Sequence, residues 1–402
     1  MKRYFIAGIF IMGAIFGKND YPIVLIHGFL GWGPDEMGGY KYWGGKDDIA
    51  DLLRQEGHTV FEVSVGPVSS NWDRAVEAYT QLKGGQVDYG KAHSEKFGLI
   101  QKPEGKTFVG LYPEWDENHP VHIIGHSMGG QTARVLQYLL ASKIYEDQES
   151  TIFEKSPLLG QVNLKWIHSI TTIATPHNGT TMAELVTNTF PFVQYFVGLA
   201  GVVGTRFYDF DLEQWNLTRK ANESWSSYVS RMRTHPAWET KNISSWDASL
   251  DGAKAMNNYA VASADIFYFS ILTSITEKNA DNHFHSPVRS APLLIRARAK
   301  ILGTKAGYWQ DGTNTDSTWY ENDGLVNTCS MAGPTTGTNG PDTITPLVEK
   351  DVLISGQWYT IGPLKMNHWN IIGHKLMLGN LSETAMDLYK SHALRLSMLP
   401  IF

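Results

Sequence analysis

Short apolar runs and amphipathic runs alternate along most of this chain. Apolar runs rich in β-branched residues predict buried strands at residues 22–26, 59–65, 121–124 and 167–174. Amphipathic runs between and after them predict helices at 47–55, 71–82 and 131–141. This alternation is typical of a mainly parallel sheet with helices on both faces. The sequence therefore predicts an α/β fold.

The pattern changes between about residues 181 and 261. Residues from Phe190 to Val203 are apolar on nearly every face, and an amphipathic helix is expected at 223–233. Such an apolar segment must be covered, either permanently by the core or intermittently by a ligand. We interpret 181–261 as an insertion that carries a helical lid, with an ordinary buried helix as the alternative.

Strand-like runs return at 267–272 and 358–366, and a closing amphipathic helix is expected at 383–399. Apart from the insertion, nothing in the pattern marks a second domain or an internal repeat. We therefore expect residues 18–402 to form one catalytic domain.

The first residues have the layout of a secretory signal peptide. Lys2 and Arg3 precede an apolar run over residues 4–16, which polar residues 18–20 follow. The run is too short to span a bilayer comfortably, since about 20 residues are needed. We expect residues 1–17 to be removed and the mature chain to be secreted without a transmembrane anchor. An uncleaved anchor or a buried strand is the alternative.

Composition supports a globular protein and excludes little else. The 402 residues are 42% hydrophobic and 18% charged, and the net charge of −6 gives no support for a nucleic-acid partner. Aromatic residues make up 12% and suggest an apolar binding surface. Cys329 is the single cysteine, so the chain cannot form an internal disulfide. We expect a monomer.

One stretch carries recognisable chemistry. Residues Gly125 to Gly129 read Gly-His-Ser-Met-Gly, directly after the strand predicted at 121–124 and before a predicted helix. In that context the pattern predicts a nucleophile elbow, a turn so tight that side chains at the glycine positions would collide with neighbouring elements. Ser127 would be exposed at a helix N-terminus that favours negative charge. A structural Gly-Ser-Gly turn is the alternative.

A serine nucleophile needs a base, and the base needs a carboxylate. In α/β-hydrolases the chain order is serine, acid, histidine. His368 follows a strand-like run near the C-terminus and is the favoured base, His374 is an alternative, and His392 lies inside the closing helix. Asp323, in an Asn-Asp-Gly turn, is the favoured acid. The alternatives that spacing leaves open are Asp311, Asp316, Asp342 and Asp351.

The developing oxyanion needs two N–H donors. We expect one from Met128, the residue after the nucleophile, and one from Phe29, in the glycine-rich loop after the first strand. The neighbouring histidines, His27 and His126, are expected to pack or to form hydrogen bonds rather than to act in catalysis.

At these residues the chain resembles the secreted triacylglycerol lipases of the staphylococcal and thermophilic-bacillus type, which have the α/β-hydrolase fold. The stretches that carry the resemblance lie at 27–33, 42–45, 69–75, 87–93, 125–134, 171–177, 321–324 and 367–368. The resemblance implies Ser127 as nucleophile, Asp323 as acid and His368 as base. It also implies oxyanion donors at Phe29 and Met128 and a lid near 190–203.

The resemblance also implies metal sites, with two departures. Asp73, His93 and Asp247 match three ligands of the family's structural zinc site, but the fourth position falls on Leu99. Three protein ligands with water can hold zinc, although more weakly than a closed site with four. The sequence therefore supports zinc binding and its absence about equally. The family's calcium ligands fall on Asn370 and Lys375, which supply no suitable oxygens, and we expect no calcium there. No cofactor is expected for the chemistry.

The leading hypothesis from the sequence is a secreted lipase that hydrolyses triacylglycerols at an oil–water interface through an acyl-enzyme. An esterase or a phospholipase that uses the same three residues without interfacial activation is the first alternative. A non-catalytic lipid-binding protein on the same scaffold is the second.

Overall fold

The computed structural model describes residues 18–144, 156–183, 208–348, 352–374 and 381–401. Several sequence-based expectations fall outside these residues. They concern the signal peptide at 1–17, the lid helix at 190–203, Asp351 and Lys375.

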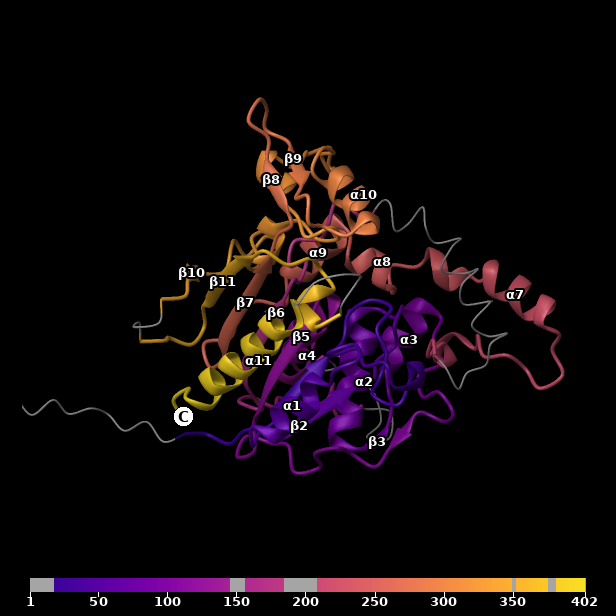
Figure 1. Cartoon of the computed structure of the whole chain (residues 1–402). Coiled ribbons are helices and arrows are strands. Elements are labelled where there is room, and N and C mark those ends of the chain that lie inside the picture. The colour runs from indigo at the N-terminus through magenta and orange to yellow at the C-terminus, as the bar shows by residue number, and fades with distance from the viewer. Residues whose placement is uncertain (1–17, 145–155, 184–207, 349–351, 375–380, 402) are drawn as a thin grey trace, which may run out of the picture.

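A seven-stranded sheet organises the described chain (Figure 1). Its strands, in spatial order, are β10 (Ile344–Pro346), β11 (Trp358–Leu364), β7 (Phe267–Thr273), β6 (Ile167–Ile173), β5 (Val121–His126), β1 (Ile23–Ile26) and β2 (Val60–Val63). Every neighbouring pair is parallel. The predicted parallel α/β architecture is confirmed, and so are the strands read from the apolar runs.

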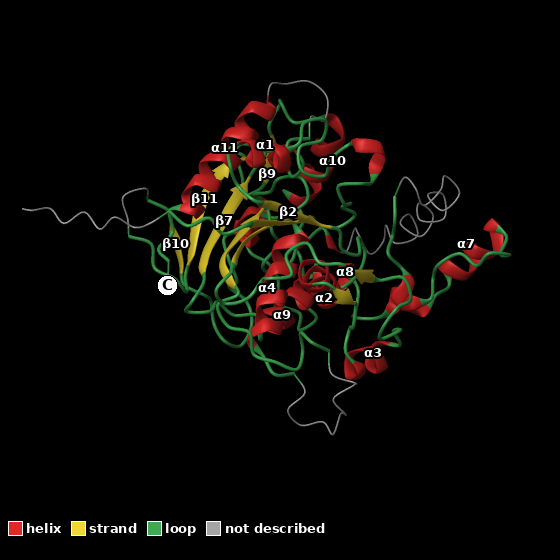
Figure 2. Ribbon diagram, turned by 90° about the horizontal axis from the view of Figure 1, so that it is seen from below, coloured by secondary structure: helices red, strands yellow, loops and turns green. Residues whose placement is uncertain are grey.

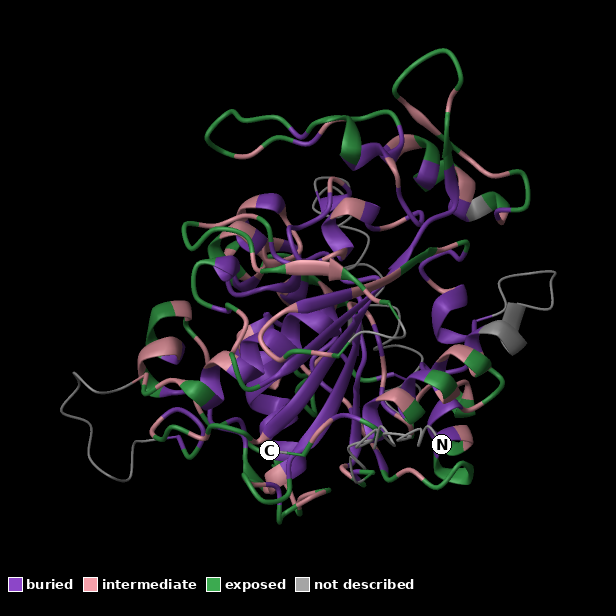
Figure 3. Ribbon diagram, turned by 90° about the vertical axis from the view of Figure 1, so that its left-hand side faces the viewer, coloured by how far each residue is buried: buried purple, intermediate pink, exposed green. Residues whose placement is uncertain are grey.

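Helices cover both faces of the sheet (Figure 2). Side chains of β1 alternate between the faces, Ile23 and Leu25 on one side, Val24 and Ile26 on the other. The first face packs against α1 (Ile49–Gln55) and α11 (Leu381–Ser397), and the second against α2 (Asn71–Lys83) and α4 (Met128–Ala141). Because both faces are covered, the central strands are buried along nearly their whole length (Figure 3).

The described part of the insertion forms an apolar cluster of its own. Its helical elements are η3 (Glu213–Trp215), α7 (Trp225–Arg233), η4 (Pro236–Glu239), α8 (Ser244–Asp247) and α9 (Leu250–Asn257). Buried Phe210, Trp215 and Ile243 pack in this cluster, and Phe29 and Leu30 from the loop after β1 pack against it. The insertion therefore supports the loop predicted to supply an oxyanion donor. Helix α7 extends away from the sheet (Figure 1).

Smaller elements complete the described chain. They are η1 (Met37–Gly39), the β3–β4 pair (Gly85–Gln86 and Thr107–Phe108), α3 (Lys91–Phe97), the β8–β9 pair (Thr276–Lys278 and His285–Pro287), α10 (Leu293–Leu302), η5 (Ser317–Tyr320), η6 (Thr328–Met331) and η7 (Asn370–Ile372). No helix within the described ranges is long and apolar enough to cross a membrane.

A partly buried ionic cluster ties the insertion to the α/β core. The ammonium group of Lys106 lies 2.9 Å from a carboxylate oxygen of Glu77 on α2, and 3.3 and 3.8 Å from those of Asp211 and Glu213 in the insertion. The Tyr89 hydroxyl also donates to Glu77, at 2.6 Å. Three carboxylates thus surround one ammonium, so full ionisation leaves excess negative charge in a poorly solvated place.

Stability is therefore expected to fall as the pH rises through this cluster. Burial raises the pKa of Asp211 to about 7, although the Lys106 ammonium opposes the shift. Between the unfolded value near 3.9 and about 7, the folded state holds a proton that the unfolded state has released. The free energy of unfolding should then decline with pH by up to about 1.4 kcal/mol per unit for this one proton. Urea unfolding at several pH values measures the slope.

Asp211→Asn should make the slope shallower by the share of this one proton, because Asp247, whose pKa burial also raises to about 7, keeps its own contribution. Asn tolerates the left-handed backbone at position 211, where φ is 48°. Asp265→Asn, at an exposed carboxylate, is the matched control and should keep the wild-type slope. An identical pH dependence in wild type and Asp211→Asn would contradict the expectation.

Candidate active site

Ser127 occupies a strained turn between β5 and α4. Its backbone angles are φ 54° and ψ −127°, a combination that L residues rarely adopt. A Cβ at Gly125 would lie 2.4 Å from the backbone of Gly129, and one at Gly129 would lie 2.1 Å from the carbonyl oxygen of Ile26. Both positions therefore exclude any side chain. The strand, turn and helix are those that the sequence predicts for the elbow.

Asp323 and His368 pair with each other, and His368 contacts His126, the residue before Ser127. Nδ1 of His368 lies 2.8 Å from Oδ2 of Asp323, and the two residues are 2% and 0% exposed. Since a carboxylate only accepts, Nδ1 carries the proton and Nε2 presents a lone pair. His126, the residue before Ser127, lies against His368 with ring centroids 4.6 Å apart. The structure therefore brings the favoured acid and base together beside the elbow.

The carboxylate of Asp323 is held by three further donors. Oδ1 accepts from the N–H groups of Leu325 and Val326, at 2.9 and 2.8 Å. Oδ2 accepts from the hydroxyl of Thr273 at 2.9 Å, in addition to His368. Thr273 ends β7, and no sequence pattern marked it as part of the site. These bonds fix the orientation of the carboxylate before any substrate arrives.

The alternative acids and bases lie elsewhere. Nε2 of His374 bonds to the carbonyl of Tyr42 at 2.8 Å, and His392 bonds to Thr171 at 2.7 Å from within α11. Asp311 pairs with Lys254 at the surface, Asp316 caps η5, and Asp342 accepts from Trp358. None of these groups is paired with another in an acid–histidine contact within the described residues.

The expected oxyanion donors flank Ser127. Phe29 and Met128 line one narrow cavity of about 50 Å³ together with Ser127. The N–H groups of Phe29 and Met128 donate to no described residue. The next N–H in the loop, that of Leu30, donates to the carbonyl of Pro67 at 3.0 Å. Both are therefore available to a group bound at Ser127.

Two buried residues hold the loop that carries Phe29. His27 donates from Nδ1 to the carbonyl of Gly28 at 2.9 Å and accepts from the N–H of Val65 at 3.1 Å. Burial lowers the pKa of His27 to about 3, so the ring stays neutral. The Arg74 guanidinium donates to the carbonyls of His27 and Gly66. The expectation that His27 fixes the loop agrees with these contacts, whereas sequence reasoning gave Arg74 no such role.

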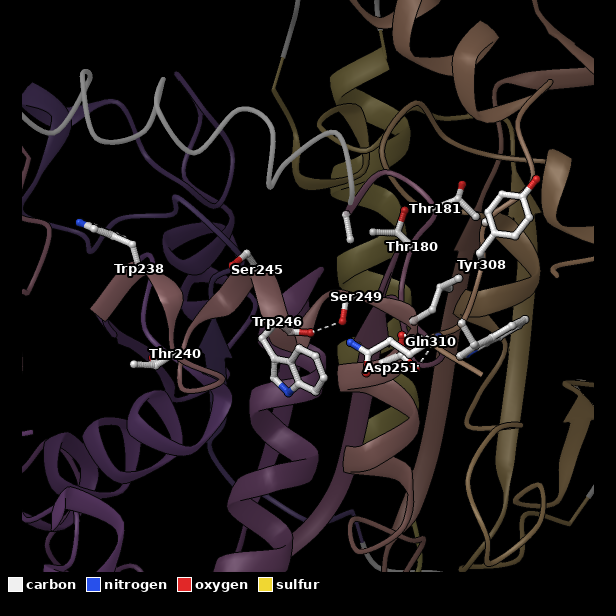
Figure 4. A pocket seen from close by; sticks show the side chains of 14 residues that line it. Thr180, Thr181, Trp238, Thr240, Ser245, Trp246, Ser249, Asp251, Tyr308 and Gln310 are labelled. Carbon is white, nitrogen blue, oxygen red and sulfur yellow. Dashed lines mark hydrogen bonds between the residues drawn. The ribbon is translucent and has the colours of Figure 1, made fainter. Parts of the chain in front are cut away.

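A larger cavity adjoins the narrow one. It encloses about 400 Å³, and both cavities are lined by Thr180, Ala183 and Ser245. Its lining includes the aromatic side chains of Trp246 and Tyr308, which Figure 4 labels. The combination of a small chamber at the serine and a wider aromatic chamber beside it suits an ester with an apolar chain.

The three zinc-type residues lie close to one another but are engaged in hydrogen bonds. Oδ1 of Asp73 lies 2.9 Å from Nε2 of His93, and its Oδ2 accepts from the side-chain amide of Asn242 at 2.8 Å. Asp247 accepts from a backbone N–H through Oδ2, at 2.5 Å. Leu99 packs against the apolar cluster of the insertion.

These residues supply three protein ligands, whereas a closed structural zinc site usually has four. Among the described residues, no group of three or more histidine, cysteine, aspartate or glutamate side chains is arranged to hold a metal. At the calcium-type position, Asn370 donates to the carbonyl of His374 at 2.8 Å.

Comparison with known proteins identifies the family to which the chain is similar. A family model described as the C-terminal domain of lipase-like proteins matches residues 19–353. Lipase 1 of Staphylococcus aureus (strain MRSA252) is 37% identical over 325 residues, which are 79% of this chain and 46% of that protein. The chain thus spans about half the length of the curated relatives it matches.

Two solved structures are similar over almost their whole length. EstA from Clostridium botulinum is 34% identical with a TM-score of 0.85, covering 97% of this chain and 90% of that one. Lipase 1 from Pelosinus fermentans is 38% identical with a TM-score of 0.80, covering 95% of this chain and 100% of that one.

Proposed function

The chain belongs to the family of lipase-like C-terminal domains, and from that premise we propose that it is a lipase that hydrolyses carboxylic esters of triacylglycerols. The observation that carries the proposal is the pairing of a strained serine elbow with the buried hydrogen bond between Asp323 and His368. The lipases named among its relatives support the same activity.

In the proposed reaction, the hydroxyl oxygen of Ser127 attacks the ester carbonyl carbon and its proton passes to Nε2 of His368. Asp323 stabilises the imidazolium that forms. The tetrahedral intermediate expels the alcohol, which takes the proton from His368, and leaves an acyl-enzyme. Water then gives a proton to His368 and attacks the acyl carbon. The second tetrahedral intermediate expels the Ser127 oxygen, which takes that proton back from His368, and the fatty acid is released.

The negative charge of the tetrahedral oxygen is stabilised in this proposal by the N–H groups of Phe29 and Met128. Their lack of partners among the described residues supports the assignment. The N-terminus of α4, which begins at Met128, adds the positive end of a helix dipole. Two N–H groups of this kind act most strongly where water is excluded, as in the narrow cavity at Ser127.

A triacylglycerol substrate is expected to give a rate that rises sharply at an interface. The aromatic cavity beside Ser127 and the apolar segment at 190–203, which lies outside the described residues, motivate this expectation. Initial rates on tributyrin, measured below and above its solubility limit, test it, and long-chain triglyceride emulsions extend the profile. A smooth saturation curve without a step would favour an esterase instead, and release of fatty acid from phosphatidylcholine alone would favour a phospholipase.

We further propose that the protein is secreted and acts as a monomer on lipid surfaces. The charged and apolar pattern of residues 1–17 supports export. Mass spectrometry of the protein from culture medium, with size-exclusion chromatography, tests both points. An intact residue 1 in cell-associated protein would argue against export.

Zinc is expected to be absent from purified protein at stoichiometric levels, because Leu99 stands where the family has its fourth ligand and three protein ligands hold zinc more weakly than four. Elemental analysis should give far less than one zinc per chain, and a chelator should leave the melting temperature unchanged. Leu99→His, which restores the family's fourth position, is the comparison variant. One zinc per wild-type chain, lost together with stability on chelation, would contradict this expectation.

A further inference from the structure

A chain of buried hydrogen bonds links the oxyanion loop to the loop of the base. The N–H of Gly28 donates to the hydroxyl oxygen of Tyr42 at 2.8 Å. The same hydroxyl lies 2.6 Å from Nδ1 of His126, and Nε2 of His126 lies 2.9 Å from the carbonyl oxygen of His368. Tyr42 and His126 are 2% and 0% exposed, so water does not compete for these bonds.

The direction of each bond follows from the groups involved. The carbonyl of His368 only accepts, so Nε2 of His126 carries the proton. Nδ1 of His126 is then an acceptor, and the Tyr42 hydroxyl must donate to it. That hydroxyl in turn accepts from the N–H of Gly28. Every donor in the chain therefore has one acceptor, and the arrangement has a single consistent set of protons.

Each end of this chain fixes a different part of the site. Holding the N–H of Gly28 fixes the peptide between His27 and Gly28, which is one peptide before the N–H of Phe29, a proposed oxyanion donor. Holding the carbonyl of His368 sets the backbone that carries the base. The middle member, His126, directly precedes Ser127 in the chain. The same two hydrogen-bonded side chains, those of Tyr42 and His126, thus connect the backbone at the nucleophile, at the base and next to one oxyanion donor.

Tyr42 is itself held in place by contacts of its backbone and of its ring. Its carbonyl accepts from Nε2 of His374 at 2.8 Å, and its ring packs edge-on to Trp32 with centroids 5.2 Å apart. A hydroxyl that bridges two groups can position them only if its own ring is fixed.

We propose that Tyr42 and His126 are positioning residues of the hydrolytic site, which act by locking the oxyanion loop and the base loop to the elbow. The inference rests on the proposed function of the same site. Neither residue touches the reacting atoms in this proposal. Misplacement of either loop by a fraction of an ångström is expected to lower the rate of the chemical steps rather than substrate binding.

Two electrostatic features agree with a positioning role. Burial lowers the pKa of His126 well below its ordinary value, and the neighbouring His368 adds to the effect. A neutral His126 places no second positive charge beside the imidazolium that His368 forms during turnover. Burial also raises the pKa of Tyr42, so its hydroxyl keeps the proton that it donates.

Tyr42→Phe removes only the bridging hydroxyl. With a soluble short-chain ester, and with active sites titrated by a phosphonate, we expect kcat to fall about 10- to 100-fold while KM stays within about 2-fold. His126→Phe should give a similar loss. His126→Gln, whose amide can donate to the His368 carbonyl and accept from Tyr42, should recover a large part of kcat. The Tyr42→Phe/His126→Phe double variant should lose no more than the worse single variant.

Tyr389→Phe is the matched control, since Tyr389 is equally buried and its hydroxyl has no hydrogen-bond partner among the described residues. It should retain wild-type kcat. Unchanged turnover per titrated site in Tyr42→Phe would overturn the inference, and so would equal losses in His126→Gln and His126→Phe. A wild type that neither hydrolyses esters nor reacts with the phosphonate would overturn the proposed function itself, whereas an active wild type with unaffected variants overturns the positioning role alone.

Discussion

Ser127→Ala is expected to reduce ester hydrolysis by on the order of 10⁶-fold in kcat, because it removes the only atom that attacks the ester carbonyl in the proposed reaction. The fold should survive the change. Alanine meets the same backbone strain at φ 54° as serine does, and it is smaller than serine at a site that is already tightly packed. The measurement is fatty-acid release from emulsified long-chain triglyceride, with protein folding checked by thermal unfolding.

A second readout separates the chemistry from binding. A fluorophosphonate probe should label wild type at Ser127 and leave Ser127→Ala unlabelled, because the probe needs the same activated hydroxyl. Ser391→Ala, at an exposed serine of α11, is the matched control and should keep both activity and labelling. Equal hydrolysis by wild type and Ser127→Ala would exclude the proposed mechanism, and the non-catalytic lipid-binding alternative would then gain support from an unlabelled wild type.

The fold could be predicted because its signals are local. Strands buried on both faces are continuous apolar runs, and the run at 121–124 stands directly before the elbow that it positions. The neighbours of each strand in the sheet could not be predicted from such local signals. β5 lies between β1 and β6, and no periodicity in the chain states that order. The pattern predicted a parallel α/β sheet, and the resemblance to a known family implied the α/β-hydrolase fold.

The site was predictable to the extent that its residues stand in recognisable turns. Ser127 and Asp323 do, whereas Tyr42 stands in an ordinary loop and Thr273 at the end of an ordinary strand. The contacts of Tyr42 reach back 14 residues to Gly28 and forward 84 residues to His126, so only tertiary structure reveals them. The same holds for Asn242, whose amide donates to Asp73 across 169 residues of the chain.

Asp323→Asn tests the electrostatic design of the site more finely than removal of the nucleophile does. Oδ1 of Asp323 accepts from two backbone N–H groups, so an asparagine must place its oxygen there and its NH₂ group at the position of Oδ2. The NH₂ group then faces the Thr273 hydroxyl, which can rotate to accept, and Nδ1 of His368.

That arrangement forces His368 into the wrong tautomer. An NH₂ donor requires Nδ1 to accept, so the proton of the neutral ring moves to Nε2, the atom that should receive the proton of Ser127. The imidazolium also loses its neighbouring negative charge. We expect kcat to fall about 10⁴-fold at neutral pH with little change in the melting temperature.

The measurement is kcat per titrated site on a soluble ester, with Asp316→Asn as the control because Asp316 is an exposed carboxylate that caps η5. A loss confined to KM, or a fall no larger than that of the control, would mean that the 2.8 Å bond between Asp323 and His368 does not orient the base. A fall of the expected size with an intact fold would assign the loss to the tautomer and charge of His368, since every other contact of the carboxylate can be kept by the amide.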